Sequence, residues 1–91
     1  MIKSYDKVII ISIHKFGLLY LFLTDKRNQH IGFYCSKNSE DALLECIKFG
    51  GRKFLDHKND KGETCLDVHN FSDYFYYKMN EILELQDLYN D

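Results

Sequence analysis

Proline and tryptophan are absent from this chain of 91 residues, and cysteine occurs three times. The missing residues, together with abundant Lys, Asn, Ile and Tyr, indicate an AT-rich genome, such as that of a low-GC bacterium, a phage or a large virus. The number of cysteines is odd and they are widely spaced, at Cys35, Cys46 and Cys65. This pattern argues against a disulfide framework. Free thiols fit a reducing compartment.

A long uninterrupted hydrophobic run is also missing. The apolar stretch from Val8 to Leu23 is broken by four residues, Ser12, His14, Lys15 and Gly17. It therefore falls short of the roughly 20 residues that span a bilayer, and no transmembrane helix is expected. Asp6 near the start, and the lack of a small-residue cleavage site, argue against a secretory signal. We expect a cytoplasmic protein, in the host cytoplasm if the chain is viral.

The composition is that of one globular domain spanning residues 1–91. Hydrophobic residues make up 45% of the chain and aromatic residues 15%, which excludes the polar composition of a disordered protein. Residues 1–37 hold six basic and two acidic side chains, whereas residues 38–91 hold six and twelve. The chain is expected to fold alone or with a copy of itself, so a homodimer stays open.

The first part of the chain, residues 1–37, has the pattern of a β-rich region. Lys7 to Phe16 is rich in β-branched residues, and a second apolar run follows Gly17. Period-two alternation predicts a three-stranded antiparallel meander over about residues 7–35. The predicted fold class is therefore α+β, with two or three helices packed on this sheet.

The second part, residues 38–91, has helix signals. Asn38 and Ser39 are good N-caps for a helix over 39–49, which Gly50 and Gly51 should end. Ser72 can cap a second helix over 73–88. This predicts a helix-rich half after Asn38.

Residues 57–71 contain potential metal ligands around Gly62. An EF-hand loop is excluded, because placing Gly62 sixth puts Lys61 fifth and Val68 twelfth. Zinc remains an alternative through His57, Cys65 and His69, although their spacing matches no ordinary zinc finger. In a short helix over 64–70, Cys65 and His69 would lie four residues apart on one face. Apart from this alternative, no metal or cofactor is expected.

The same stretch resembles part of an ankyrin repeat. Residues 55–68 match best, through Asn59, Asp60, Gly62, Thr64 and Leu66, and the resemblance extends over about residues 41–86. It implies that Gly62 permits a tight turn, that Thr64 caps a following helix and that Leu66 enters the core. One and a half repeats do not make a stable solenoid, so the helices are expected to pack on the strands.

The favoured function is protein binding without catalysis, as in phage- or virus-encoded inhibitors of host factors. Residues 79–91 carry four acids and no base beside an aromatic cluster, which predicts a surface for a basic protein partner. The predicted contact residues are Tyr74, Tyr76, Tyr77, Glu81, Glu84 and Asp87.

Two other classes remain as alternatives. An enzyme would need a pocket built from His14, His30, Cys35 or residues 57–69. Cys35 could pair with His30 or His14, but no sequence context orients a third group. Nucleic-acid binding would use the basic half, although its basic residues are isolated rather than clustered: Lys3, Lys7, Lys15, Lys26, Arg27 and Lys37.

Overall fold

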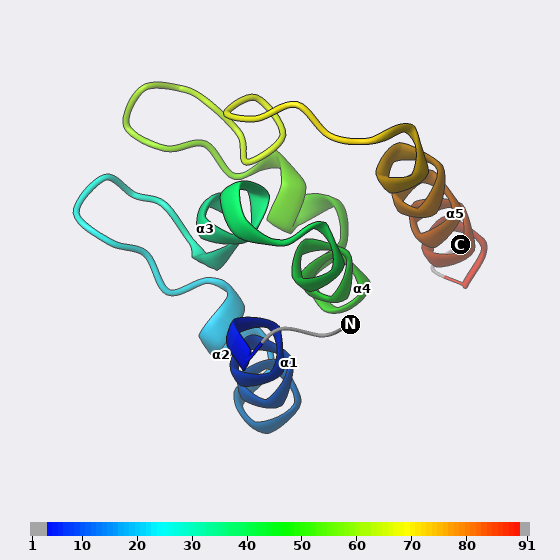
Figure 1. Ribbon diagram of the computed structural model, residues 1–91, viewed down its shortest axis with the longest axis horizontal. Coiled ribbons are helices and arrows are strands. Elements are labelled where there is room, and N and C mark those ends of the chain that lie inside the picture. Colours follow the sequence, from blue (N-terminus) through cyan, green and yellow to red (C-terminus); the bar gives the residue numbers. More distant parts are fainter. Residues whose placement is uncertain (1–3, 90–91) are drawn as a thin grey trace.

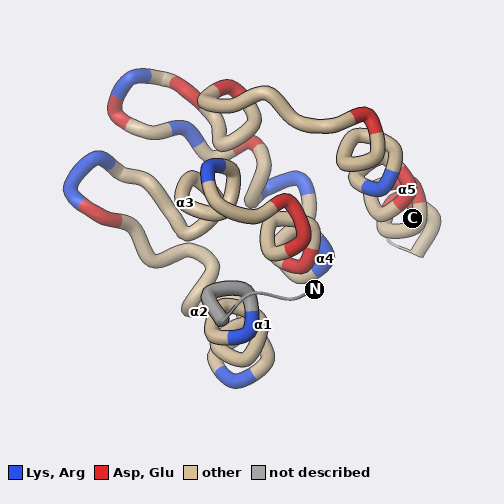
Figure 2. Tube along the Cα trace, in the orientation of Figure 1, with Lys and Arg blue, Asp and Glu red and all other residues tan. Residues whose placement is uncertain are grey.

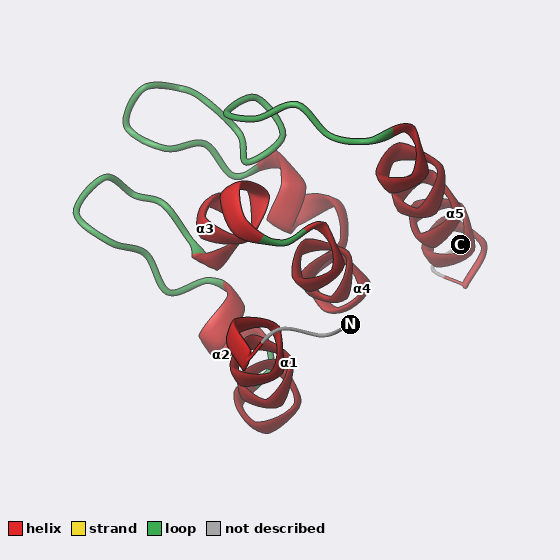
Figure 3. Ribbon diagram, in the orientation of Figure 1, coloured by secondary structure: helices red, strands yellow, loops and turns green. Residues whose placement is uncertain are grey.

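The chain folds into a stack of α-helices, shown in Figure 1. The computed structural model describes residues 4–89, and side chains from Lys7 to Tyr89. The helices are α1 (Ser4–Phe16), α2 (Leu18–Leu21), α3 (Ile31–Asn38), α4 (Glu40–Asp56) and α5 (Asp73–Tyr89). Within the described range there is no β-strand (Figure 3).

The predicted three-stranded meander over residues 7–35, and with it the α+β class, is wrong. The region forms α1, α2 and most of α3 instead. Ile9 and Ile13 are 2% and 1% exposed, while Ile11 between them is 64% exposed. Burial thus recurs every four residues, as on a helix, rather than every two. The β preference of isoleucine is overridden here by packing, because that preference depends strongly on context.

The two expected helices in the second part are present, with different bounds. The Ser39 hydroxyl accepts a hydrogen bond from the Ala42 amide at 3.2 Å, and Ser72 caps α5 through the Phe75 amide at 3.1 Å. Gly51 has φ 65° and ψ −153°, outside the helical region, so the first helical segment of α4 ends at the expected glycines. A second helical segment follows this kink and continues to Asp56, and the two segments together make up α4.

Helices α1, α4 and α5 lie side by side, and α3 packs on α4 (Figure 1). α4 contacts each of the other four helices and is the centre of the stack. The core contains these fully buried side chains: Ile13, Leu21, Leu43, Ile47, Phe54 and Phe75. Hydrogen bonds also join the starts of α4 and α5. The Glu40 carboxylate accepts them from the amide and the hydroxyl of Ser72, which caps α5, at 2.9 and 2.7 Å.

The backbone repeats itself at an interval of 34 residues. Gly17 lies between α1 and α2 with φ 59° and ψ −136°, and Gly51 holds nearly the same conformation in α4. Each glycine follows a long helical segment and precedes a short one. α1 and α2 therefore correspond to the two parts of α4.

The loops after these helices repeat at the same interval. The Asp25 carboxylate accepts hydrogen bonds from the backbone amides two and four residues later, at 2.8 and 3.0 Å. Asn59 does the same with its side-chain oxygen, at 2.9 and 3.0 Å. Three residues after each, Asn28 and Gly62 have φ values of 62° and 78°. The positive φ expected at Gly62 is confirmed, and the two loops share one turn design.

Candidate protein-binding surface

The outer side of α5 exposes aromatic and acidic side chains. Phe75, Met79 and Leu83 recur every four residues and are buried against the rest of the protein. Because successive helix residues point about 100° apart, Tyr77 and Leu88 face away from this buried stripe. They are 65% and 73% exposed. This helix therefore offers a surface that no other described part of the chain covers.

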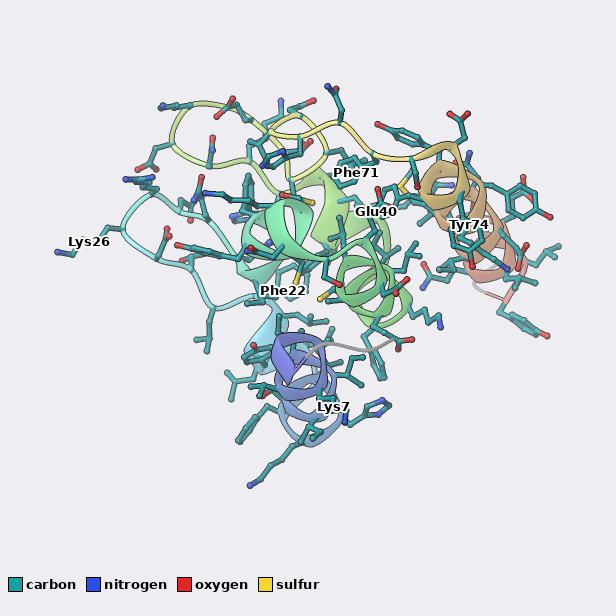
Figure 4. The ribbon with its side chains drawn as sticks, in the orientation of Figure 1. Lys7, Phe22, Lys26, Glu40, Phe71 and Tyr74 are labelled. Carbon is teal, nitrogen blue, oxygen red and sulfur yellow. The ribbon has the colours of Figure 1, made fainter. Side chains whose placement is uncertain are left out.

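A groove of ≈ 400 Å³ lies beside this surface, between α4 and α5. One apolar side chain from each of three helices lines it: Ile10, Leu44 and Ile82. Its polar lining consists of Asp41, Glu45, Lys48, Tyr74, Lys78 and Glu81. Tyr74, labelled in Figure 4, is 61% exposed and stands at the α5 side of the groove. The groove joins apolar contact area to carboxylates, a combination suited to a mixed apolar and basic segment.

Lys78 moderates the charge of this surface. Its ammonium lies 3.9 Å from the Glu81 carboxylate and 5.8 and 5.9 Å from the ring centres of Tyr74 and Tyr77. These distances allow cation–π attraction and hold the two tyrosines around one cation. One helical turn further on, Glu84 is exposed and has no ion-pair partner among the described residues.

Two of the six predicted contact residues are engaged elsewhere. Tyr76 packs edge-on against Phe71 and Phe75, with ring centres 6.0 and 5.7 Å away. Asp87 pairs with Arg52 at 2.7 Å, and this guanidinium lowers the pKa of the Asp87 carboxyl. The remaining four, Tyr74, Tyr77, Glu81 and Glu84, lie together on the exposed side of α5.

The alternative zinc ligands His57, Cys65 and His69 do not converge. The His57 ring nitrogen lies 2.8 Å from the Asn28 carbonyl, and this contact joins the loop after α4 to the loop after α2. Cys65 is buried, and burial raises the pKa of its thiol to about 12. His69 is exposed on a turn. Among the side chains that the structure describes, residues 7–89, no cluster of three or more His, Cys, Asp or Glu is arranged for a metal.

The expected helix after Thr64 is a turn, so Thr64 does not act as a helix cap. Instead, its backbone amide donates to the Asp67 carboxylate at 2.9 Å. This hydrogen bond lowers the pKa of Asp67. Residues 65–69 thus form a turn followed by a bend, and Cys65 is buried in the core.

The cysteine and histidine pair considered for catalysis is engaged in packing. Cys35 is buried, and Cys46 beside it has a raised pKa because of their mutual contact and burial. His30 accepts the Gly32 amide at Nδ1, while its Nε2 lies 2.7 Å from the Phe54 carbonyl. Both ring nitrogens of His30 are therefore satisfied by the backbone. His14 is exposed and packs edge-on against Phe49.

The basic residues of the first half do not gather into one stripe. Figure 4 shows Lys7 on α1 and Lys26 on the first loop, far from each other. Figure 2 shows basic positions on α1 and at the tip of the loop after α2, where an acidic position lies beside them, with neutral residues between the two places. Lys37 lies in the last turn of α3, and Lys3 lies outside the described residues.

Sequence reasoning missed a second exposed surface, on α1 and α2. Several large apolar side chains are exposed on these helices and on the two residues that follow α2: Val8, Ile11, Phe16, Leu18, Leu19, Phe22 and Leu23. A cleft of ≈ 280 Å³ runs among Phe16, Leu19, Tyr20 and Leu23. The signal was present in the sequence, because α1 has apolar residues at positions 8 and 11 in addition to 9 and 13. An interpretation as strands places all of these positions on the faces of a sheet that helices cover.

No family model, curated protein or solved structure matches this chain. Among the described residues, no helix is long and apolar enough to cross a membrane.

Proposed function

We propose that this protein is a small protein-binding module that acts by docking. Its contact surface is the exposed side of α5, formed by Tyr74, Tyr77, Glu81, Glu84 and Leu88 and called here the α5 face. The observation that carries the proposal is the joint exposure of two tyrosines and two carboxylates beside the groove between α4 and α5. The partner is a protein segment with basic and apolar side chains.

The two kinds of side chain have separate tasks in this binding. Exposed carboxylates attract a basic partner over distances of about a Debye length, which raises the rate of association. Tyrosines add large contact areas with few rotatable bonds, and such residues usually determine how slowly a complex dissociates. In an inhibitor, the same face would act by covering a basic surface of its target.

The architecture supports a role as a scaffold for binding. The 34-residue interval of Gly17 and Gly51, and of Asp25 and Asn59, is close to the period of about 33 residues in ankyrin repeats. We infer that the chain is a short ankyrin-type stack. Such stacks present exposed surfaces on a rigid body, which limits the entropy lost on binding.

Selection from a random peptide library on the immobilised protein tests the function. We expect the recovered peptides to combine Lys or Arg with Leu, Ile or aromatic residues, and to bind less tightly as salt rises. Glu81→Lys with Glu84→Lys should weaken their binding at least ten-fold. Both positions are exposed, so the fold is expected to survive.

A matched variant controls for the change in net charge. Asp56→Lys with Asp60→Lys alters the charge by the same amount at exposed positions outside the α5 face. Its affinity for the selected peptides should equal that of the wild type at physiological salt. Equal losses in the two double variants, or no loss in either, would contradict a specific role of the α5 face.

A further inference from the structure

The outer side of α1 and α2 is apolar although nothing in the described structure covers it. Val8, Ile11, Leu18 and Leu19 are 58–71% exposed, and Lys7 and Lys15 lie on the same side of α1. These six residues are called here the α1–α2 face. Ile9 and Ile13, on the opposite side of α1, are buried toward the core. α1 therefore has apolar residues on both sides, as expected of a helix placed between two neighbours.

The internal repeat allows a position of α1, at the end of the stack, to be compared with the equivalent position of α4, inside it. Ala42 lies 34 residues after Val8 and has 0% exposure, because α4 is packed between α1 and α5. Val8, at the equivalent position of the end helix, is 62% exposed. By this comparison, the end helix lacks a neighbour that the central helix has.

A second comparison concerns the residue types at equivalent positions of the end helix and the central helix. The equivalents of Leu18 and Leu19, 34 residues later, are Arg52 and Lys53, both exposed. Arg52 pairs with Asp87 of α5, and Lys53 is exposed, so charged residues occupy these positions inside the stack and leucines occupy them on the α1–α2 face. A cluster of this size is unusual for a surface that stays in solvent.

The charges of the α1–α2 face complement those of the α5 face. Residues 7–24 contain Lys7 and Lys15 and no acid, while residues 79–91 contain four acids and no base. Of these, Lys7 and Lys15 lie on α1, and Glu81 and Glu84 lie on α5, at opposite ends of the stack (Figure 2). Each face also has apolar or aromatic side chains that would be buried by the other.

We propose that the α1–α2 face of one copy binds the α5 face of a second copy. This inference rests on the proposed function, since it names the basic, apolar partner of the α5 face as the chain itself. α5 of one copy would pack on α1 of the next, as α4 packs on α1 and α5 within the chain. The two faces differ, so the contact is head to tail and leaves one free face at each end. Assembly is open-ended unless the rotation between successive copies closes it into a ring.

Sedimentation velocity over a range of protein concentrations tests the proposal. The wild type should form a ladder of species whose mean mass rises with concentration and falls with salt. Ile11→Asp and Glu81→Lys with Glu84→Lys should each weaken association at least ten-fold. Asp56→Lys with Asp60→Lys should leave it unchanged. Circular dichroism of each variant verifies that the helices are intact.

Mixing the two defective variants gives the sharper result. Ile11→Asp copies keep an intact α5 face, and Glu81→Lys with Glu84→Lys copies keep an intact α1–α2 face. An equimolar mixture should form one-to-one pairs and no longer species, because each pair has a defective face at both ends. A mixture that stays monomeric would overturn the head-to-tail contact.

The outcomes distinguish this inference from the proposed function. A wild type that stays monomeric up to about 1 mM, yet still binds the selected basic peptides, overturns self-association and leaves the proposed function standing. Association lost in Ile11→Asp but kept in the Glu81 and Glu84 variant would mean that two α1–α2 faces pair, which also overturns the proposal. Flotation of the monomer with anionic lipid vesicles would assign the α1–α2 face to a membrane surface instead.

Discussion

His30 joins three parts of the molecule with one buried side chain. It has 0% exposure and stacks on Phe54 with ring centres 3.9 Å apart. Its Nδ1 accepts the Gly32 amide at the start of α3, so the ring proton lies on Nε2 and is donated to the Phe54 carbonyl. A second proton would occupy Nδ1 and remove the acceptor that caps α3.

This geometry predicts lower stability in mild acid. Burial, with a smaller contribution from the His57 ring 4.9 Å away, lowers the pKa of His30 below 6.5. The unfolded chain then binds a proton more readily than the folded chain. The stabilisation is therefore complete above pH 6.5 and is lost as the pH falls through the folded-state pKa. Urea unfolding at about pH 7.5 and 5.5 should show a lower free energy of unfolding at the acidic value.

Two variants assign this pH dependence to its source. His30→Gln should be less stable than the wild type at neutral pH and should lose less stability on acidification. His69→Gln changes an exposed histidine and should retain the wild-type pH dependence. An undiminished acid effect in His30→Gln would place the responsible group elsewhere.

At the scale of elements, the sequence predicted the helices that are defined by local signals. Ser39 and Ser72 mark the starts of α4 and α5 in the sequence, and both caps are present. α1 was predicted wrongly because its apolar residues at 9, 11 and 13 fit a strand, while burial selects 9 and 13. Because α1 also has apolar residues at positions 8 and 11, the helical period of its buried residues is hidden in the sequence. Packing in the assembled stack, and not local preference, decides which side is buried.

The candidate site was predictable to a similar degree. The acidic and aromatic composition of α5 identified Tyr74, Tyr77, Glu81 and Glu84, which share one exposed side. The sequence alone did not reveal the Arg52 partner of Asp87, because that contact joins residues 35 apart. The 34-residue interval between equivalent glycines was readable, and it would have aligned residues 1–37 with a helical repeat.

Gly17 and Gly51 allow the sharp bends between a long and a short helical segment. Both have positive φ with ψ near the extended region, a conformation open to glycine and costly for other residues. An added Cβ at Gly51 would also lie 3.0 Å from the Gln86 amide oxygen, whereas Gly17 has free space. The Gln86 amide nitrogen donates to the Ile47 and Lys48 carbonyls, so this contact ties α5 to α4.

We expect Gly17→Ala and Gly51→Ala each to lower the free energy of unfolding by about 1–3 kcal/mol, with the larger loss at Gly51. Chemical denaturation measures both losses. Asn80→Ala, at an exposed position inside α5, provides a control that should change stability by less than about 0.5 kcal/mol. Losses no larger than that of the control would mean that the bends accept a side chain.

At the scale of the molecule, stability should be distributed unevenly along the stack. α4 contacts all other helices, while α1 and α5 each pack on it from one side. Repeat proteins with contacts between adjacent layers can lose an end layer without unfolding the rest. The same uncovered ends carry the two faces proposed to bind.

Hydrogen exchange on dilute protein, at about 5 µM, tests this distribution. Backbone amides of α4 should exchange slowest, and those of α1 and α5 should exchange earlier. Met79→Pro interrupts α5 at a buried position and should destabilise that helix by about 3 kcal/mol or more. If the layers are separable, the variant loses protection throughout α5 while α4 keeps measurable protection on the side packed against α1 and α3. Simultaneous loss of protection in every helix would instead show that the stack unfolds as one cooperative unit, because removing a single end contact would then have released the entire core.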